Sequence, residues 1–190
     1  MVYETTVQSL GLREFLTGDY ESKAEYVPDD LYQQLLRNMV IFCVDGILVN
    51  RGEMLIAKRR VHPHPDWWHI GGRMRPGESF AQAAIRNLKR ELGLEFAPVR
   101  FVQLGLYNLI WPTSRSGVDD SGVHDVSLTM LIFVTEEERA MIKLNEEYEG
   151  EPRWIRPDDL TVNSLDYHPA LVQMASDVAA YLAKGYSASS

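Results

Sequence analysis

The sequence predicts an α/β (α+β) fold in which a mixed β-sheet lies between helices. Three observations predict it. Residues 40–49 and 53–60 are rich in aliphatic and β-branched residues, and the turn signal Asn50-Arg-Gly52 joins them into a hairpin. Residues 79–92 carry apolar side chains at helical spacing. Residues 169–184 form a second predicted helix near the end of the chain, so strands and helices are mixed along the sequence.

The predicted helix at residues 79–92 has clear ends. Ser79 opens it, and Gln82 three residues later completes a capping box. Gly93 ends it as a C-cap. Its apolar stripe is expected to face the core and consists of Ala81, Ala84, Ile85, Leu88 and Leu92.

The remaining elements follow from composition and turn signals. Residues 28–37 are predicted to form a short helix that Asp29 or Asp30 caps. Residues 61–66 form a proline-broken loop before a short strand at 67–70. Further predicted elements are strands at 99–110, 126–134 and 153–156, a short helix at 136–144, and a long loop at 111–123.

A chain of 190 residues is expected to form one domain. We assign residues 1–27 to an N-terminal extension, residues 28–184 to the domain and residues 185–190 to a flexible tail. No apolar run is long enough to span a membrane, the start does not resemble a signal peptide, and Cys43 is the only cysteine. These features predict a cytoplasmic protein that has no membrane partner.

The net charge of −8 argues against a nucleic-acid polymer as the partner, because binding to a phosphate backbone needs a cationic surface. An acidic protein that handles an anionic small molecule must recruit a metal ion or gather its arginines in one place. The sequence has the residues for both.

The most informative stretch is a glycine loop that runs into the predicted amphipathic helix. Glu78 stands directly before this helix, and Glu91 stands near its end. With Gly72, Arg86 and Gly93, they have the spacing of the Nudix box, Gly-x5-Glu-x7-Arg-Glu-U-x-Glu-Glu-x-Gly-U, where U is aliphatic. The chain therefore resembles Nudix hydrolases. The resemblance implies an α/β/α sandwich with a mixed sheet, hydrolysis of a nucleoside diphosphate linked to another moiety, and Mg²⁺ as cofactor, with Mn²⁺ as an alternative.

Glu91 is the expected metal ligand. It flanks the apolar stripe at the edge of the core, where a carboxylate is poorly solvated and gains most from a cation. Mg²⁺ takes about six oxygens, often including water and substrate phosphates. A backbone carbonyl of Gly71 or Gly72 is expected to supply another of these oxygens. A glutamate on an amphipathic helix is usually only solvated, but the joint match to the box favours the metal role.

The box departs from the family pattern at two positions, because Asn87 and Arg90 stand where the family has glutamate. A guanidinium about 6 Å from a dication costs on the order of several kcal/mol. We therefore expect one ion on Glu91 rather than a cluster of two or three. The usual base role at position 87 is also lost, because an amide cannot accept a proton at neutral pH.

The sequence is most similar to the GDP-mannose mannosyl hydrolase branch of the family. The resemblance is carried by Val44-Asp45, by the stretch from Gly52 to Arg59, and by Gly71-Gly72-Arg73. It implies that water attacks the sugar C1 and that GDP leaves as the metal-bound group. It further implies that Arg59 and Arg73 hold the diphosphate, with Arg73 also acting in catalysis, and that Asp45 helps to hold the nucleotide or the sugar.

The sequence leaves the general base open. The histidines of that branch are missing here, so Glu147 and Glu149 are the best candidates and His124 is a weaker one. A solvated acidic loop is an equally good interpretation of the two glutamates, and a surface position is the better interpretation of the histidine. Trp111 and Tyr107 are candidates for stacking on a base or for core packing.

Three functions compete. The first is a Mg²⁺-dependent hydrolase of a nucleotide sugar that releases the sugar and the nucleoside diphosphate. The second is a Nudix pyrophosphatase that cleaves the P–O–P bridge of ADP-ribose, a nucleotide sugar or a nucleoside triphosphate. The third is a catalytically weakened module that binds a nucleotide. The partner is a small molecule in each case, and the resemblance leads us to expect a homodimer.

Overall fold

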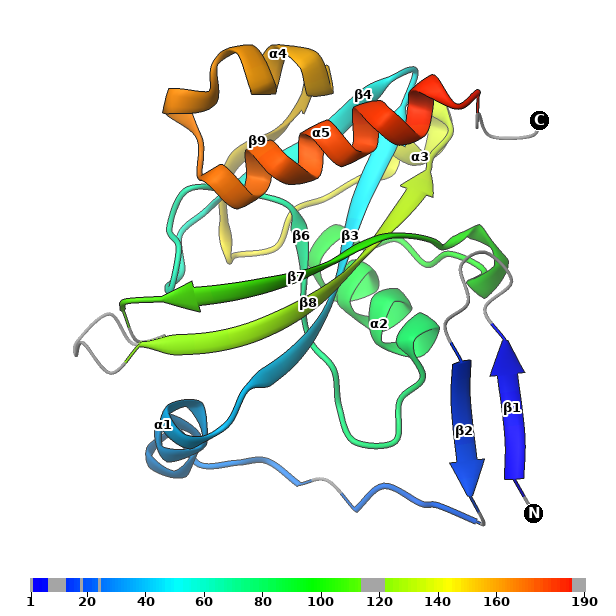
Figure 1. Ribbon diagram of the computed structural model, residues 1–190, viewed down its shortest axis with the longest axis vertical. Coiled ribbons are helices and arrows are strands. Elements are labelled where there is room, and N and C mark those ends of the chain that lie inside the picture. The colour runs from blue at the N-terminus through cyan, green and yellow to red at the C-terminus, as the bar shows by residue number, and fades with distance from the viewer. Residues whose placement is uncertain (1, 7–12, 18, 24, 114–121, 186–190) are drawn as a thin grey trace.

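The computed structural model describes residues 2–6, 13–17, 19–23, 25–113 and 122–185 (Figure 1). The central strands are β3 (Ile41–Asn50), β4 (Glu53–Arg59), β5 (Trp67–Trp68), β6 (Ile70–Arg73), β7 (Val102–Trp111), β8 (Val123–Phe133) and β9 (Tyr148–Ile155). Within the described residues these seven strands form one sheet in the order β5-β4-β3-β8-β7, with β6 also paired to β3 and β9 to β4. β3 and β8 run parallel, whereas the other pairs run antiparallel, so the predicted mixed sheet is confirmed.

The turn between β3 and β4 has the geometry of a tight hairpin. Asn50 pairs with Glu53, and the two residues between them, Arg51 and Gly52, have φ angles of 48° and 82°. Two consecutive residues with positive φ give a two-residue turn whose twist matches that of the flanking strands. The hairpin predicted from the Asn50-Arg-Gly52 signal is confirmed.

The helix α2 (Phe80–Leu92) has the ends that the sequence predicts. The Ser79 hydroxyl accepts a hydrogen bond from the backbone N–H of Gln82, and the Gln82 side chain accepts one from the backbone N–H of Ser79. Gly93 follows the helix in the left-handed conformation, with φ of 73°, and its N–H donates to the carbonyl of Lys89. The predicted capping box and C-cap are confirmed.

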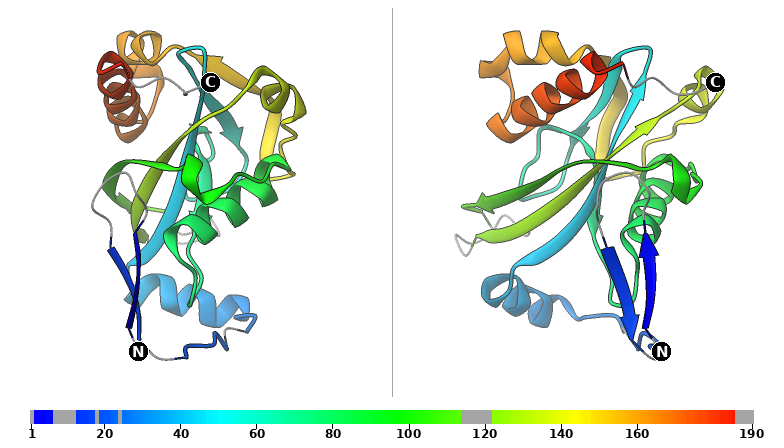
Figure 2. Two further views of the ribbon diagram at one scale, coloured as in Figure 1. Left: turned by 90° about the vertical axis from the view of Figure 1, so that its right-hand side faces the viewer. Right: turned by 45° about the vertical axis from the view of Figure 1, so that its right-hand side comes forward.

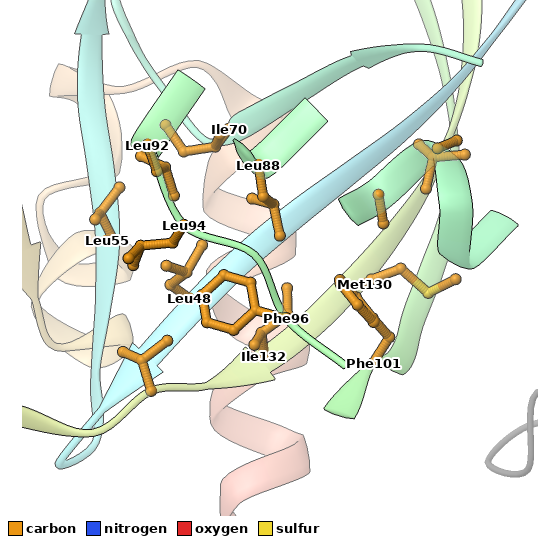
Figure 3. Close-up of a cluster of buried hydrophobic side chains, with 14 of the residues drawn as sticks. Leu48, Leu55, Ile70, Leu88, Leu92, Leu94, Phe96, Phe101, Met130 and Ile132 are labelled. Carbon is orange, nitrogen blue, oxygen red and sulfur yellow. The ribbon is translucent and has the colours of Figure 1, made fainter. Parts of the chain in front are cut away.

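The apolar stripe of α2 packs on one face of the sheet. Figure 3 shows Leu88 and Leu92 of α2 in one cluster with Leu48 of β3, next to Phe96 and Phe101. Leu88 and Leu92 are fully buried. Burying a leucine side chain stabilises a protein by roughly 1.5–3 kcal/mol, so this stripe fixes the helix, and the polar residues between its leucines, against the sheet.

The opposite face of the sheet is covered by α5 (Pro169–Ala183), with α4 (Pro157–Val162) beside it (Figure 2). Leu171, Met174 and Val178 of α5 are buried in a second apolar cluster with Ile47 and Met54 of the sheet. Helices therefore lie on both faces, and the predicted α/β/α arrangement is confirmed. No helix within the described ranges is long and apolar enough to cross a membrane.

The helix α1 (Asp29–Asn38) forms as predicted, but its predicted cap is wrong. Pro28 occupies the N-cap position, and no side chain there accepts a hydrogen bond from the helix backbone. Asp29 and Asp30 lie inside the first turn instead, where negative charge interacts favourably with the helix dipole.

Several boundaries differ from the prediction. β9 begins at Tyr148 rather than at residue 153, because its first residues pair with the end of β4. α4 was not predicted. The loop predicted at 111–123 is shorter, because β7 and β8 include its two end residues, and residues 114–121 and 186–190 lie outside the described residues. The smaller elements are η1 (Pro98–Arg100), α3 (Glu136–Met141) and η2 (Ser164–Asp166).

The N-terminal residues form a separate antiparallel pair, β1 (Val2–Thr6) and β2 (Arg13–Thr17), apart from the central sheet (Figure 1). The backbone N–H of Phe80, the first residue of α2, donates a hydrogen bond of 2.6 Å to the carboxylate of Glu14. A carboxylate at a helix N-terminus satisfies a free backbone donor and interacts favourably with the dipole. The division of the chain at residue 27 stays a prediction.

Candidate active site

A cavity of about 1410 Å³ opens between α1, the first half of β3, β6 and one side of α2. Among the described residues, five arginines line it, namely Arg59, Arg73, Arg75, Arg86 and Arg90. Its lining also includes the carboxyl groups of Asp45, Asp125 and Glu147 and the rings of Tyr32, Trp68 and Trp111. The cavity therefore combines a concentration of positive charge with carboxyl groups and aromatic surface.

Glu78 and Arg86 form an ion pair that shapes the glycine loop. Arg86 donates through Nε and Nη2 to the two carboxylate oxygens of Glu78, and Nη2 also donates to the carbonyl of Arg73 at 2.9 Å. The backbone N–H of Arg75 donates to Glu78 at 2.7 Å. Partial burial opposes ionisation of Glu78, but these hydrogen bonds outweigh it and lower its pKa. The two box residues thus hold the loop in place.

Glu91 is enclosed by donors from three elements. Its side chain is 1% exposed. Oε2 accepts hydrogen bonds from the backbone N–H of Gly71, at 3.2 Å, and from the hydroxyl of Tyr148, while Oε1 accepts one from the guanidinium of Arg90. Burial raises the pKa of Glu91, and the Tyr148 hydrogen bond and the Arg90 charge oppose that rise. Burial and the adjacent Glu91 raise the pKa of Tyr148, so its phenol stays protonated and donates.

Arg90 separates Glu91 from the cavity. Its side chain is 44% exposed and lines the cavity, whereas Glu91 does not reach the cavity surface. The guanidinium therefore occupies the side of the carboxylate from which a dissolved cation would approach.

Asn87 replaces a box glutamate and is also buried. Its side-chain amide donates to the carbonyls of Val44, at 3.0 Å, and Gly72, at 2.8 Å, and its oxygen accepts from Arg86 at 2.7 Å. A glutamate at this position could not donate these bonds. Asn87 thus ties α2 to β3 and β6, and it engages the Gly72 carbonyl, one of the two carbonyls predicted for the metal.

Asp45 lies on β3 opposite Gly71 of β6 and is 6% exposed. The Ser127 hydroxyl donates to Oδ2 of Asp45. Burial raises the pKa of Asp45 to about 8, the Ser127 hydrogen bond opposes the rise, and the nearby Asp125 carboxylate adds to it. Asp45 is therefore a neutral acid at pH 7. Gly71 has a φ of 152°, and a Cβ there would lie 2.1 Å from Oδ1 of Asp45, so only glycine fits this approach.

Asp125 sits near the start of β8 and accepts a hydrogen bond of 2.7 Å at Oδ2 from the indole Nε1–H of Trp111. Partial burial raises the pKa of Asp125, and the Trp111 hydrogen bond and the Arg59 charge oppose the rise. Arg73 also lines the cavity, with its guanidinium carbon 4.8 Å from the centre of the Tyr32 ring. The structure thus brings the predicted residues Asp45, Arg59 and Arg73 to one cavity.

The three base candidates from the sequence are not equivalent. Glu147 lines the cavity, and its charge contributes to the raised pKa of Glu91. Glu149 is 60% exposed, pairs with Lys58 at 3.2 Å and does not line the cavity. His124 also lies outside the cavity lining. Only Glu147 is placed with the other candidate residues.

The two stacking candidates are also separated. Trp111 lines the cavity and stacks on the ring of His64, with ring centres 5.4 Å apart. Tyr107 packs toward α5, where its hydroxyl donates to Asp177 at 2.7 Å. Trp111 borders the cavity but is only 6% exposed and belongs to the second apolar cluster, and Tyr107 packs against the same cluster.

The donor set suits one divalent cation at most. In the part of the chain that the structure describes, no three His, Cys, Asp or Glu side chains are grouped to hold a metal ion. The carboxylates of Glu91 and Glu147 are hard oxygen donors of the kind Mg²⁺ prefers. They fit one such ion if Arg90 leaves Glu91, with the remaining positions available to backbone, water and substrate oxygens.

Sequence reasoning missed Tyr148 and Asp125. Tyr148 stands between the candidate glutamates Glu147 and Glu149, in a segment predicted to be an acidic loop. Side chains of a strand alternate between faces, so extending β9 to this segment would have turned Tyr148 toward the core. Asp125 directly precedes the predicted strand at 126–134, and no local signal marks it as a cavity residue.

Comparisons with known proteins agree with this architecture. The model of the NUDIX domain family matches residues 39–177. Similar solved structures include a MutT NUDIX hydrolase from Burkholderia pseudomallei (19% identity, covering 74% of this chain and 99% of that chain, TM-score 0.56). They also include a MutT protein from Methanosarcina mazei Go1 (18%, 78% and 96%, TM-score 0.56) and a C. elegans Ap4A hydrolase binary complex (17%, 77% and 100%, TM-score 0.54). At these low sequence identities, the comparison shows a shared fold and nothing more. No curated protein sequence matches the chain.

The family match supports the prediction that the chain is a hydrolase. Nudix hydrolases generally use divalent metal ions. The similarity to the GDP-mannose mannosyl hydrolase branch and the residue roles derived from it stay predictions.

Substitution of Arg90 by glutamine is expected to tighten Mn²⁺ binding to the ligand-free protein about tenfold, because a neutral side chain no longer pairs with Glu91 or repels the cation. Isothermal titration calorimetry with MnCl₂ measures the affinity. Lys89→Gln is the matched control, since it makes the same charge change at the neighbouring position, where the ammonium pairs with the exposed Glu95. Equal Mn²⁺ affinity of the wild type and Arg90→Gln would contradict competition between Arg90 and the cation.

Asp45 is expected to make the protein less stable as the pH rises. In the unfolded chain the Asp45 carboxyl group loses its proton above its ordinary pKa of 3.8, whereas in the folded protein its pKa is about 8. The free energy of unfolding therefore falls as the pH rises across this range. Asp45→Asn mimics the neutral acid and is expected to reduce that fall. Urea unfolding at several pH values measures it, with Asp177→Asn, outside the cavity, as control. If the free energy of unfolding depends on pH equally in the wild type and in Asp45→Asn, the raised pKa of Asp45 is ruled out as the cause.

Proposed function

Because the chain belongs to the NUDIX domain family, we propose that it is a Mg²⁺-dependent hydrolase of a nucleoside diphosphate linked to a sugar. In the proposed reaction, water attacks the sugar C1, and the sugar and the nucleoside diphosphate are released. The observation that carries this proposal is the cavity lined by five arginines of the described residues, in a chain whose net charge is −8.

The arginines supply the binding site for the diphosphate. An acidic chain repels a polyanion in general, so a local group of guanidinium ions is needed to bind one. Guanidinium groups bind phosphate oxygens in a bidentate manner. Arg86 is already committed to Glu78, so it positions the loop rather than the ligand. Arg59 and Arg73 line the cavity and are assigned to the diphosphate, together with Arg90.

Arg90 couples the diphosphate to the cation. Its guanidinium pairs with the buried Glu91 and is partly exposed to the cavity. A diphosphate offers more negative charge than one carboxylate, so it draws the guanidinium from Glu91 to itself. Glu91 and Glu147 would then be the residues that hold Mg²⁺, and the bound ion would neutralise the negative charge of the leaving diphosphate.

We assign the part of the cavity lined by Asp45 and Asp125 to the sugar, and we place the cleavage at carbon. Departure of a diphosphate from C1 requires neutralisation of the leaving group more than activation of water at phosphorus. Asp45 is a neutral acid beside this site and can donate a hydrogen bond to a sugar or phosphate oxygen.

A Nudix pyrophosphatase is the second candidate. The position of Glu147 near Glu91 favours it, because it places a second carboxylate where water could be activated at phosphorus. The third candidate, a nucleotide-binding module without activity, is favoured by the pairing of Arg90 with Glu91, which covers the one box carboxylate suited to a metal. The expected homodimer and cytoplasmic location stay predictions.

Products and isotope position separate these candidates. In H₂¹⁸O with Mg²⁺, GDP-mannose is expected to yield GDP and ¹⁸O-labelled mannose, as measured by mass spectrometry. A pyrophosphatase would yield GMP and a sugar phosphate with label on phosphorus, and a binding module would yield neither. Label on phosphorus contradicts the proposed cleavage at carbon.

Loss of Arg59 or Arg73 is expected to lower kcat/KM for GDP-mannose about 10- to 100-fold, because each removes a charge-assisted hydrogen bond to the diphosphate. Steady-state kinetics of Arg59→Ala and Arg73→Ala measure the effect. Arg51→Ala is the control, since Arg51 is exposed and pairs with Glu136 at 2.9 Å, away from the cavity. Unchanged kinetics in both cavity variants would refute the arginine site.

A further inference from the structure

We infer that Asp125 is the general base of the proposed reaction and takes the proton from the water that attacks the sugar C1. This inference rests on the proposed function and deepens it. The sequence leaves the base open.

Asp125 lines the cavity near Arg59, in the part that we assign to the sugar. It shares the cavity lining with Asp45 and Trp111, while Arg59 is near enough for its charge to act on both aspartates. The parallel pairing of β3 with β8 sets Asp125 opposite Ile41 and brings both aspartates to the same stretch of paired strands. A sugar whose diphosphate lies on Arg59 therefore has Asp125 beside it.

The carboxylate of Asp125 is oriented and keeps capacity for a proton. The indole of Trp111 donates to Oδ2 at 2.7 Å and fixes the plane of the group. A carboxylate accepts through both oxygens, so Oδ1 can receive the proton of a water molecule. Partial burial makes the group more basic than an ordinary aspartate, against the opposing effects of the Trp111 hydrogen bond and of the charges on Arg59 and His124.

Three other carboxyl groups near the cavity are excluded by their protonation, their ion pair or their position. Asp45 already carries a proton at neutral pH, so it cannot accept one. Glu149 is exposed and paired with Lys58 outside the cavity. Glu147 lies with Arg90 and Glu91, at the end of the cavity assigned to the cation.

His124 does not compete with its neighbour Asp125. Its Nε2 lies 2.6 Å from the amide oxygen of Asn108, and its ring lies outside the cavity lining. Glu25, Asp29 and Asp30 also line the cavity, but they belong to α1 and the segment before it, whereas Asp125 lies on the sheet with Asp45 and is held by Trp111.

The step is balanced without any further reactant. The water oxygen forms a bond to C1, and the bond between C1 and the β-phosphate oxygen breaks. The electron pair of that bond leaves with the diphosphate, and the water proton passes to Oδ1 of Asp125. Attack from the face opposite the diphosphate inverts the configuration at C1, and the proton then returns to solvent.

The test uses the full-length protein, GDP-mannose and Mg²⁺. Asp125→Asn keeps the size of the side chain and is expected to lower kcat about 10²- to 10⁴-fold with KM little changed, because only proton acceptance is lost. In the wild type, kcat/KM is expected to fall at low pH with an apparent pKa above that of an ordinary aspartate. Asp125→Asn is expected to lack this fall. Asp177→Asn is the matched control, since Asp177 also accepts one aromatic donor at 2.7 Å but lies outside the cavity.

Azide supplies a second measurement that does not depend on the asparagine variant. Azide attacks C1 without releasing a proton, so it is expected to restore turnover in Asp125→Ala and to give mannosyl azide of inverted configuration. Thermal unfolding of both variants shows whether they are folded. A folded Asp125→Asn that keeps kcat within about threefold of the wild type, or that keeps the fall of kcat/KM at low pH, overturns the assignment.

The isotope experiment separates failure of this inference from failure of the proposed function. If wild-type protein places ¹⁸O on the sugar while Asp125→Asn stays active, the base assignment alone is wrong. If the label appears on phosphorus, cleavage at carbon is wrong and the role of Asp125 is wrong with it.

Discussion

The burial of Glu91 is the constraint on which the site depends. A carboxylate at 1% exposure is stable in its charged form only when donors surround it, and here they come from Gly71, Tyr148 and Arg90. These residues belong to β6, β9 and α2, so satisfying one charge fixes three elements around the cavity. Leaving a buried charge without its partner costs roughly 3–5 kcal/mol, a large share of the stability of a domain this size.

The same contact decides how the site can meet a metal and a polyanion. In the family box, a glutamate at position 90 would add negative charge beside Glu91, whereas this chain places a guanidinium there. Asn87 replaces the second glutamate with a donor that binds the carbonyls of Val44 and Gly72. Both departures replace a carboxylate that could bind a cation with a hydrogen-bond donor, so the site is better suited to bind anions. Under our proposal, a diphosphate and one cation arrive together, and Arg90 exchanges its partner as they do.

Local features of this chain could be predicted, and features that depend on distant contacts could not. The hairpin at Asn50-Arg-Gly52 and the capping box at Ser79 are short-range arrangements, so the sequence predicts them directly. The hydrogen bond of Tyr148 to Glu91 joins residues 57 positions apart, and that of Trp111 to Asp125 joins the paired strands β7 and β8. Nothing near either residue signals the contact, because it forms only when the sheet brings the strands together. The sequence shows Arg90 as a departure from the box, but its pairing with the buried Glu91 follows only from the placement of α2 against β6.

The exchange of Arg90 from Glu91 to the diphosphate is the central claim, and a crystal structure with GDP and Mn²⁺ tests it most directly. Anomalous scattering locates the manganese without reference to activity. Our account predicts one manganese peak in contact with the Glu91 carboxylate, with the Arg90 guanidinium turned toward the diphosphate. Bound GDP with the guanidinium still paired to Glu91, and no manganese at that carboxylate, would contradict it.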